Sequence, residues 1–275
     1  MIPKKELLNI IYFCLDKFSE KTGFYLSSEN TKIALFTPKT GVKVYENFCK
    51  DDFPKNLKEN YMEEGYFEGF DGQAFVGEAK YGLFIRSNLD ISMDAYMEMI
   101  LHECSHIFCT VNEIATDDFY DRYCLQEGVK GDNLYNGYAI WREAIADIFK
   151  DILFITNKVY YLSDVKRFMT DYETEFVREP NARKTLVAQL ISVIVIYTNM
   201  RERKNWGETQ KLLKESKLFQ EETLYSLLEK VFAQLKKDKF WEIDEDYIAS
   251  LGRTYSAYKE EKDRLNFARR IGVIN

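Results

Sequence analysis

Apolar residues recur at helical spacing at the start of the chain and throughout its second half. Between residues 4 and 20, one stripe of a helix collects apolar side chains, namely Leu7, Ile10, Ile11, Cys14 and Phe18. After residue 160 the pattern is helical only, over about 163–178, 181–203, 208–235 with a break, and 245–269. We therefore expect an N-terminal helix and a C-terminal lobe built from helices alone.

Shorter apolar runs bounded by turn residues occur between residues 30 and 90. Residues 32–37 and 42–45, separated by Pro38 and Gly41, predict a β-hairpin. Residues 81–86 form the strongest strand candidate. Strands before residue 90 and helices afterwards predict an α+β fold with a small mixed or antiparallel sheet. We expect one domain over residues 1–160 and a helical lobe over 161–275.

Two strong helices are expected between these regions. The first spans about residues 92–110, with Ser92 as its N-cap, and is apolar over more than half of its circumference. Residues 112–136 are rich in Asp, Gly and Asn and predict a loop. The second helix runs from about residue 137 to 156 and is also strongly apolar.

The chain contains two histidines, and they lie four residues apart in the run His102-Glu103-Cys104-Ser105-His106. On one face of a helix this spacing provides two metal ligands and a glutamate that can act as a general base. Cys104 would face away from both histidines. A helix that buries only these polar groups needs a partner for them, and a metal ion supplies one. The alternative is a pair of histidines at the surface or packed in the core.

A catalytic zinc site usually has three protein ligands, so a carboxylate or thiolate must complete it. Glu143 and Asp147 lie one turn apart on the apolar second helix. We predict Glu143 as the third ligand and Asp147 as the acceptor of a histidine N–H. The alternative is an ordinary solvent-exposed stripe extended by Asp151. Three loop carboxylates also compete for the third position: Glu113, Asp117 and Asp118.

Composition excludes several classes of function. The net charge of −7 argues against nucleic acid as a partner. The apolar run at 186–197 is too short to favour a membrane span, so no membrane partner is expected. Five cysteines without a C-x-x-C pair are typical of reduced thiols. These features, with no recognisable export signal, predict a cytoplasmic protein.

The run from His102 to His106, followed by Glu143-x-x-Ala146-Asp147-x-Phe149, resembles the gluzincin metallopeptidases, and in particular minimal gluzincins such as the ImmA/IrrE-type intracellular peptidases. The resemblance covers about residues 80–155. It implies one Zn²⁺ per chain held by His102, His106 and Glu143, with Glu103 as the general base. It also implies that an extended peptide pairs with the strand before the first motif, which here contains Tyr81, Leu83 and Ile85.

The expected function is therefore zinc-dependent hydrolysis of peptide bonds in a protein or peptide substrate. With both histidines used as ligands, a second donor to the substrate carbonyl must be another group. Tyr135, Tyr138 and Arg142 are near the second motif, and Tyr138 is our candidate substrate contact. The alternatives are a catalytically silent zinc-binding regulator, a helical interaction protein without metal, and a metallo-toxin with the same ligands.

Overall fold

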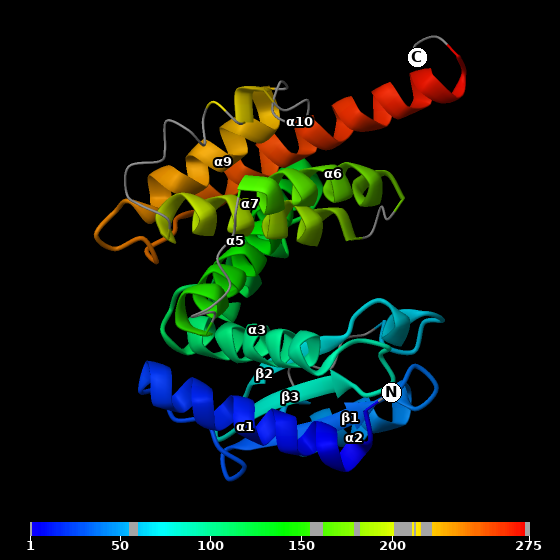
Figure 1. Ribbon diagram of the computed structural model, residues 1–275, viewed down its shortest axis with the longest axis vertical. Coiled ribbons are helices and arrows are strands. Elements are labelled where there is room, and N and C mark those ends of the chain that lie inside the picture. Colours follow the sequence, from blue (N-terminus) through cyan, green and yellow to red (C-terminus); the bar gives the residue numbers. More distant parts are fainter. Residues whose placement is uncertain are drawn as a thin grey trace. The chain divides into compact units, whose positions relative to one another are not determined.

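The computed structural model describes residues 2–54, 60–154, 162–178, 182–200, 211, 213–215 and 222–272. Its first part contains a three-stranded sheet with helices on both faces (Figure 1). The elements, in chain order, are α1 (Lys4–Thr22), β1 (Thr31–Phe36), α2 (Gly41–Asp52), the short 3₁₀ turn η2 (Tyr66–Glu68), β2 (Gly72–Val76), β3 (Tyr81–Arg86) and α3 (Met93–Val111).

The sheet is mixed, with strand order β1-β3-β2. β1 pairs with β3 in parallel, with Thr31 opposite Tyr81, and β2 pairs with β3 in antiparallel, with Gly72 opposite Ile85. A backbone hydrogen bond from Gly77 N to Lys80 O, 2.9 Å long, closes the turn between β2 and β3. The expectation of an α+β fold with a small mixed sheet is confirmed.

Residues 42–45 do not form the second strand of a hairpin, and that prediction was wrong. They belong to α2, whose inner face buries Tyr45, Phe48 and Cys49 at helical spacing. A short apolar run of this kind fits either a strand or one side of a helix. The buried residues four apart decide in favour of the helix.

Side chains on the two faces of the sheet belong to different core clusters. Leu83 and Ile85 of β3 pack with α1 and α3, whereas Phe84 packs on the other face with α2. The α2 cluster is almost entirely aromatic, and the rings of Phe36 and Phe84 stack with their centroids 4.3 Å apart. The sheet is thus covered on both faces, and α3 lies on the side that carries Leu83 and Ile85.

The described residues after α3 are helical or lie in turns and loops. The elements are α4 (Asp117–Phe119), the π-helical turn η3 (Tyr120–Cys124), α5 (Gly128–Phe154), α6 (Leu162–Arg178), α7 (Arg183–Met200), α9 (Glu222–Leu235) and α10 (Glu245–Arg270). Among the described residues beyond 160, helices are the only regular elements, as the sequence predicts. The loop expected over 112–136 is wrong in part, because α5 begins at Gly128 and short helical turns precede it.

The chain divides into two compact units, Met1–Asn112 with Phe149–Thr156, and Glu113–Ile148 with Asn157–Asn275. In the second unit α5 crosses α10 in close backbone contact, where a Cβ added at Gly252 would lie 1.8 Å from the carbonyl oxygen of Asn133. In addition, Ser192 of α7 donates to the carbonyl of Ala144, 3.3 Å away. These contacts explain why much of α5 groups with the later helices. The expected division into domains 1–160 and 161–275 stays a prediction.

Candidate metal centre

The two histidines lie on α3, as the sequence predicts. Ser92 is the N-cap of this helix, and its hydroxyl accepts a hydrogen bond from Ala95 N at 3.2 Å. Glu103 and His106 are buried, with 7% and 4% of their surface exposed, and His102 is half-buried. The motif therefore points into the protein and not into bulk solvent.

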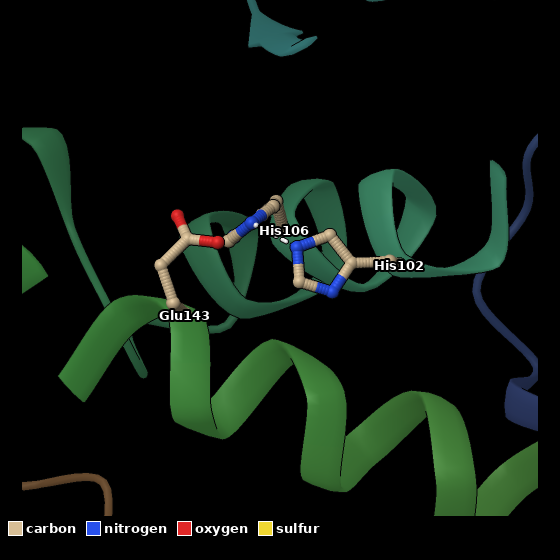
Figure 2. A group of neighbouring side chains, drawn as sticks. All are labelled: His102, His106 and Glu143. Carbon is tan, nitrogen blue, oxygen red and sulfur yellow. Dashed lines mark hydrogen bonds between the residues drawn. The ribbon is translucent and has the colours of Figure 1, made fainter. Parts of the chain in front are cut away.

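The imidazoles of His102 and His106 converge at their Nε2 atoms, which are 2.9 Å apart. The two rings are perpendicular, with centroids 4.5 Å apart. A carboxylate oxygen of Glu143 completes the group, and the three ligand atoms all lie within 4.8 Å of one another (Figure 2). His102, His106 and Glu143 form a group that could hold a metal ion.

The donor set fits a divalent transition metal. Two imidazole nitrogens and one carboxylate oxygen are the protein ligands of many catalytic zinc sites, in which a fourth position stays open. Zinc–nitrogen bonds of about 2.0–2.1 Å place two tetrahedral nitrogen ligands about 3.3 Å apart. The 2.9 Å between the Nε2 atoms is slightly shorter than this, so a small opening of the two rings is sufficient.

Glu143 is carried by α5, a continuous helix of 27 residues. Near its C-terminal end, Phe149 packs against Phe108 of α3 with ring centroids 5.6 Å apart. On the other side of Glu143, the indole of Trp141 donates to the carbonyl of Ile114, 3.1 Å away. A ligand on such a helix has a better-defined position than one on a loop.

The loop carboxylates that compete for the third position are not part of the group. Glu113, Asp117 and Asp118 are exposed, and Asp118 pairs with Arg122 at 2.8 Å. Cys104 is not a ligand either, since its side chain belongs to the core between α1 and the sheet. Burial raises the pKa of the Cys104 thiol well above its usual value, and the neighbouring Cys14 adds to this effect.

Asp147 lies one turn after Glu143 and is buried, with 8% of its surface exposed. Burial argues against the alternative of an ordinary solvent-facing stripe, because Asp151, one turn further, is also buried at 3%. The predicted role of Asp147 as the acceptor of a histidine N–H stays a prediction.

Gly72, the first residue of β2, lies against the side chain of Glu103. A Cβ at this glycine would be 3.1 Å from both Cγ and Oε1 of Glu103. The strand therefore approaches the carboxylate more closely than any other residue type would allow without adjustment. Sequence reasoning missed this neighbour, although the series of glycines at 65, 69, 72, 77 and 82 was a visible signal.

The expected substrate strand requires a correction. Tyr81–Arg86 is the central strand of the sheet and pairs with β1 on one side and β2 on the other, so it has no edge to which a peptide could be added. The side chains of Leu83 and Ile85 are fully buried in the core, and Tyr81 packs on Phe24 with centroids 5.4 Å apart. The pairing of β3 with β1 could not be read from the sequence, because β1 lies far upstream of β3.

Tyr138 also has a role within the fold. Its hydroxyl donates to the carbonyl of Thr116 at 2.7 Å, and its ring stacks on Phe119 with centroids 5.7 Å apart. Only 3% of its surface is exposed. These contacts hold the segment after α3 against α5, and they use the hydroxyl that a substrate carbonyl would need.

Comparisons with family models, with curated proteins and with solved structures find no match to this chain. In the described part of the chain, no helix combines the length and the apolar character needed to cross a bilayer.

Proposed function

We propose that this chain is a zinc-dependent metallopeptidase that hydrolyses peptide bonds in a protein or peptide substrate. The observation that carries the proposal is the convergence of His102, His106 and Glu143, with the buried Glu103 on the same helix. A structural metal site has no need for an additional buried carboxylate next to one of its ligands. A hydrolytic site needs one as a general base.

The proposed metal is zinc, one ion per chain, bound by His102, His106 and Glu143. When bound, it supplies Lewis acidity, which makes water a nucleophile near neutral pH and polarises a carbonyl group. Two histidines and one carboxylate also bind iron(II) in oxygenases. The position of Glu103 favours zinc and hydrolysis, because proton transfer by a carboxylate belongs to the hydrolytic reaction.

Glu103 would accept the proton of the attacking water on its carboxylate and deliver it to the nitrogen of the leaving amine. Burial of Glu103 and its contact with Gly72 restrict the carboxylate to few orientations, which favours proton transfer along one direction. The chain thus provides both the base and its orientation.

An extended peptide would bind along β2. Among the described strands, β1 and β2 each pair on one side only, and β2 is the one whose first residue is the glycine beside Glu103. Main-chain hydrogen bonds to a free strand edge bind peptides without strong demands on their side chains. A substrate paired with β2 would therefore pass close to the proposed general base.

The replacement Glu103→Gln tests the base. It keeps the size of the side chain and removes its basicity, so peptide cleavage should fall by roughly a hundredfold or more while zinc content stays near that of the parent. Glu98→Gln on the same helix is the matched control and should retain activity. Cleavage by Glu103→Gln at the parental rate would contradict the proposal.

The replacement Glu143→Ala tests the ligand. We expect zinc affinity, measured by competition with a chelator on protein without a histidine tag, to fall by roughly a hundredfold or more. Asp117→Ala, at one of the competing loop carboxylates, should bind zinc as the parent does. If the parent binds zinc tightly and cleaves no peptide in a broad library, the chain is a zinc-binding regulator and not a peptidase.

A further inference from the structure

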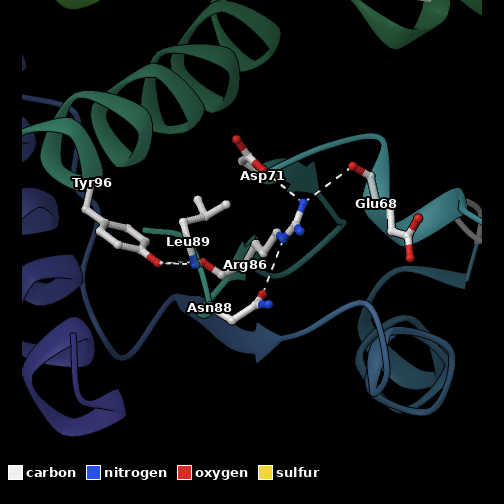
Figure 3. Close-up of polar contacts among 6 residues, drawn as sticks. All are labelled: Glu68, Asp71, Arg86, Asn88, Leu89 and Tyr96. Carbon is white, nitrogen blue, oxygen red and sulfur yellow. Dashed lines mark hydrogen bonds and ion pairs between the residues drawn. The ribbon is translucent and has the colours of Figure 1, made fainter. Parts of the chain in front are cut away.

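Arg86, the last residue of β3, connects three segments of the chain (Figure 3). Its Nη1 donates to the carbonyl of Glu68 at 3.4 Å and to the carboxylate of Asp71 at 3.3 Å. Its Nε donates to the side-chain oxygen of Asn88, 3.3 Å away. One planar guanidinium therefore holds both the segment that enters β2 and the segment that leaves β3.

The backbone of Arg86 is held as firmly as its side chain. Its N–H donates to the carbonyl of Asp71 at 2.8 Å. Its carbonyl accepts the hydroxyl of Tyr96, a residue in the second turn of α3, at 3.3 Å. The same hydroxyl accepts the N–H of Leu89 at 3.1 Å. The start of α3 and the start of β2 are thus both fixed to Arg86.

Residues 68–71 lead directly into Gly72, which touches the Glu103 carboxylate. Any shift of Asp71 moves Gly72, because the two are consecutive. Glu103 follows Tyr96 by two turns on the same helix. Arg86 therefore sets the separation between the two parts of the chain that meet at Glu103.

The ion pair itself adds little to stability. The side chain of Arg86 is 20% exposed and that of Asp71 is 54% exposed, and solvent screens a pair so exposed strongly. Three donor contacts from a single rigid plane are more than charge neutralisation requires. Their shared effect is geometric, since they fix the direction from which the chain enters β2.

We propose that Arg86 is a positioning residue for Glu103, acting through the contacts of its side chain with Glu68 and Asp71, at the entry to β2. This inference rests on the proposed function of Glu103 as general base. Arg86 does not touch the substrate in this scheme. It keeps Gly72 at the carboxylate, and its loss allows the first residues of β2 to move away from α3.

The test compares Arg86→Met and Arg86→Lys with the parent, in the full chain loaded with zinc. Arg86→Met should lower kcat by roughly ten- to a hundredfold, the effect of a displacement of about 1 Å near a reacting group. Arg86→Lys keeps the charge but not the planar fork, so it should recover only part of this loss. Full recovery by lysine would mean that charge alone matters and would overturn the proposal.

A double-mutant cycle separates positioning from general weakening of the fold. In the Glu103→Gln background, Arg86→Met should have little further effect on the residual rate, because the group that it positions is already absent. An equal loss in both backgrounds would overturn the proposal. Lys32→Met is the matched control, since Lys32 of β1 forms an ion pair with Asp52, the last residue of α2, at 2.6 Å. It should leave kcat within about twofold of the parent.

Amide hydrogen exchange gives a readout that does not depend on activity. Arg86→Met should speed exchange at residues 69–76 and leave β1 unchanged, whereas Lys32→Met should not affect residues 69–76. If the parent cleaves no peptide, the proposed function fails, and this exchange pattern still decides whether Arg86 holds the strand beside Glu103. Unchanged exchange at residues 69–76 in Arg86→Met would overturn the proposal in either case.

Discussion

Gly72→Ala is expected to separate activity from stability. The new methyl would lie 3.1 Å from Cγ and Oε1 of Glu103 and 3.3 Å from Cδ, a few tenths of an ångström closer than comfortable contact. The contact is with a side chain and not with backbone, so Glu103 can shift by a few tenths of an ångström at a cost of about 1 kcal/mol. Replacing glycine also restricts the unfolded chain, which stabilises the fold by about 0.4–1 kcal/mol. The two terms nearly cancel.

The expected effect on catalysis has no such compensating contribution. If Glu103 is the base, shifting its carboxylate should lower kcat/KM by about tenfold or more, or about 1.4 kcal/mol in transition-state stabilisation. The assay combines urea unfolding with cleavage of a fluorogenic peptide at fixed zinc. Gly69→Ala is the matched control, because its nearest atom would be the Tyr66 carbonyl oxygen at 3.5 Å, an ordinary contact. Parental kcat/KM in Gly72→Ala would refute the placement of the carboxylate in the reacting enzyme.

Three further predictions concern the scaffold. Gly252→Ala should destabilise the protein by at least about 2–3 kcal/mol in urea unfolding, because its methyl would be 1.8 Å from the Asn133 carbonyl oxygen; an unchanged midpoint would contradict the close helix crossing. Tyr138→Phe should cost about 1 kcal/mol in the same assay through loss of the hydrogen bond to Thr116, and a neutral result would show that the bond is not needed. Burial raises the pKa of Cys14 to about 12, so this thiol should resist iodoacetamide at pH 8 until urea unfolds the chain; rapid labelling of the native protein, mapped by mass spectrometry, would show that it is exposed.

The group that could hold a metal ion was predictable from sequence because its spacing is helical. His102 and His106 are one turn apart on a helix whose cap is also readable, and Glu143 is an acid within an apolar helical pattern. Helical spacing and capping patterns in the sequence are therefore sufficient to identify each candidate ligand. The contact between Gly72 and Glu103 was not predictable, because strand pairing and the helix packed on the sheet bring them together and neither is encoded locally.

The errors in the fold have the same physical origin. The resemblance to gluzincins implied that β3 is an edge strand. Its parallel partner β1 was not recognised, because α2 and the region before β2 separate the two strands along the chain. Residues 128–136 were expected in a loop because the stretch is rich in Asp, Gly and Asn, and the second helix was expected to start only near Gly137. In the structure Gly137 faces the backbone of α10, where a Cβ would be 2.0 Å from the carbonyl oxygen of Ile248. This glycine lies inside α5 and permits two helices to cross closely.

The strand order has a consequence for the order of folding. β2 and β3 are joined by a tight turn and can pair within microseconds, whereas the parallel pairing of β1 with β3 requires closure of a much longer loop. α3 follows β3 directly along the chain. Gly72, Glu103 and both histidines therefore belong to one locally connected segment that can form early, and the carboxylate of Glu143 is added later from α5. The three groups that could hold a metal ion are therefore complete only after α5 has been synthesised and has folded.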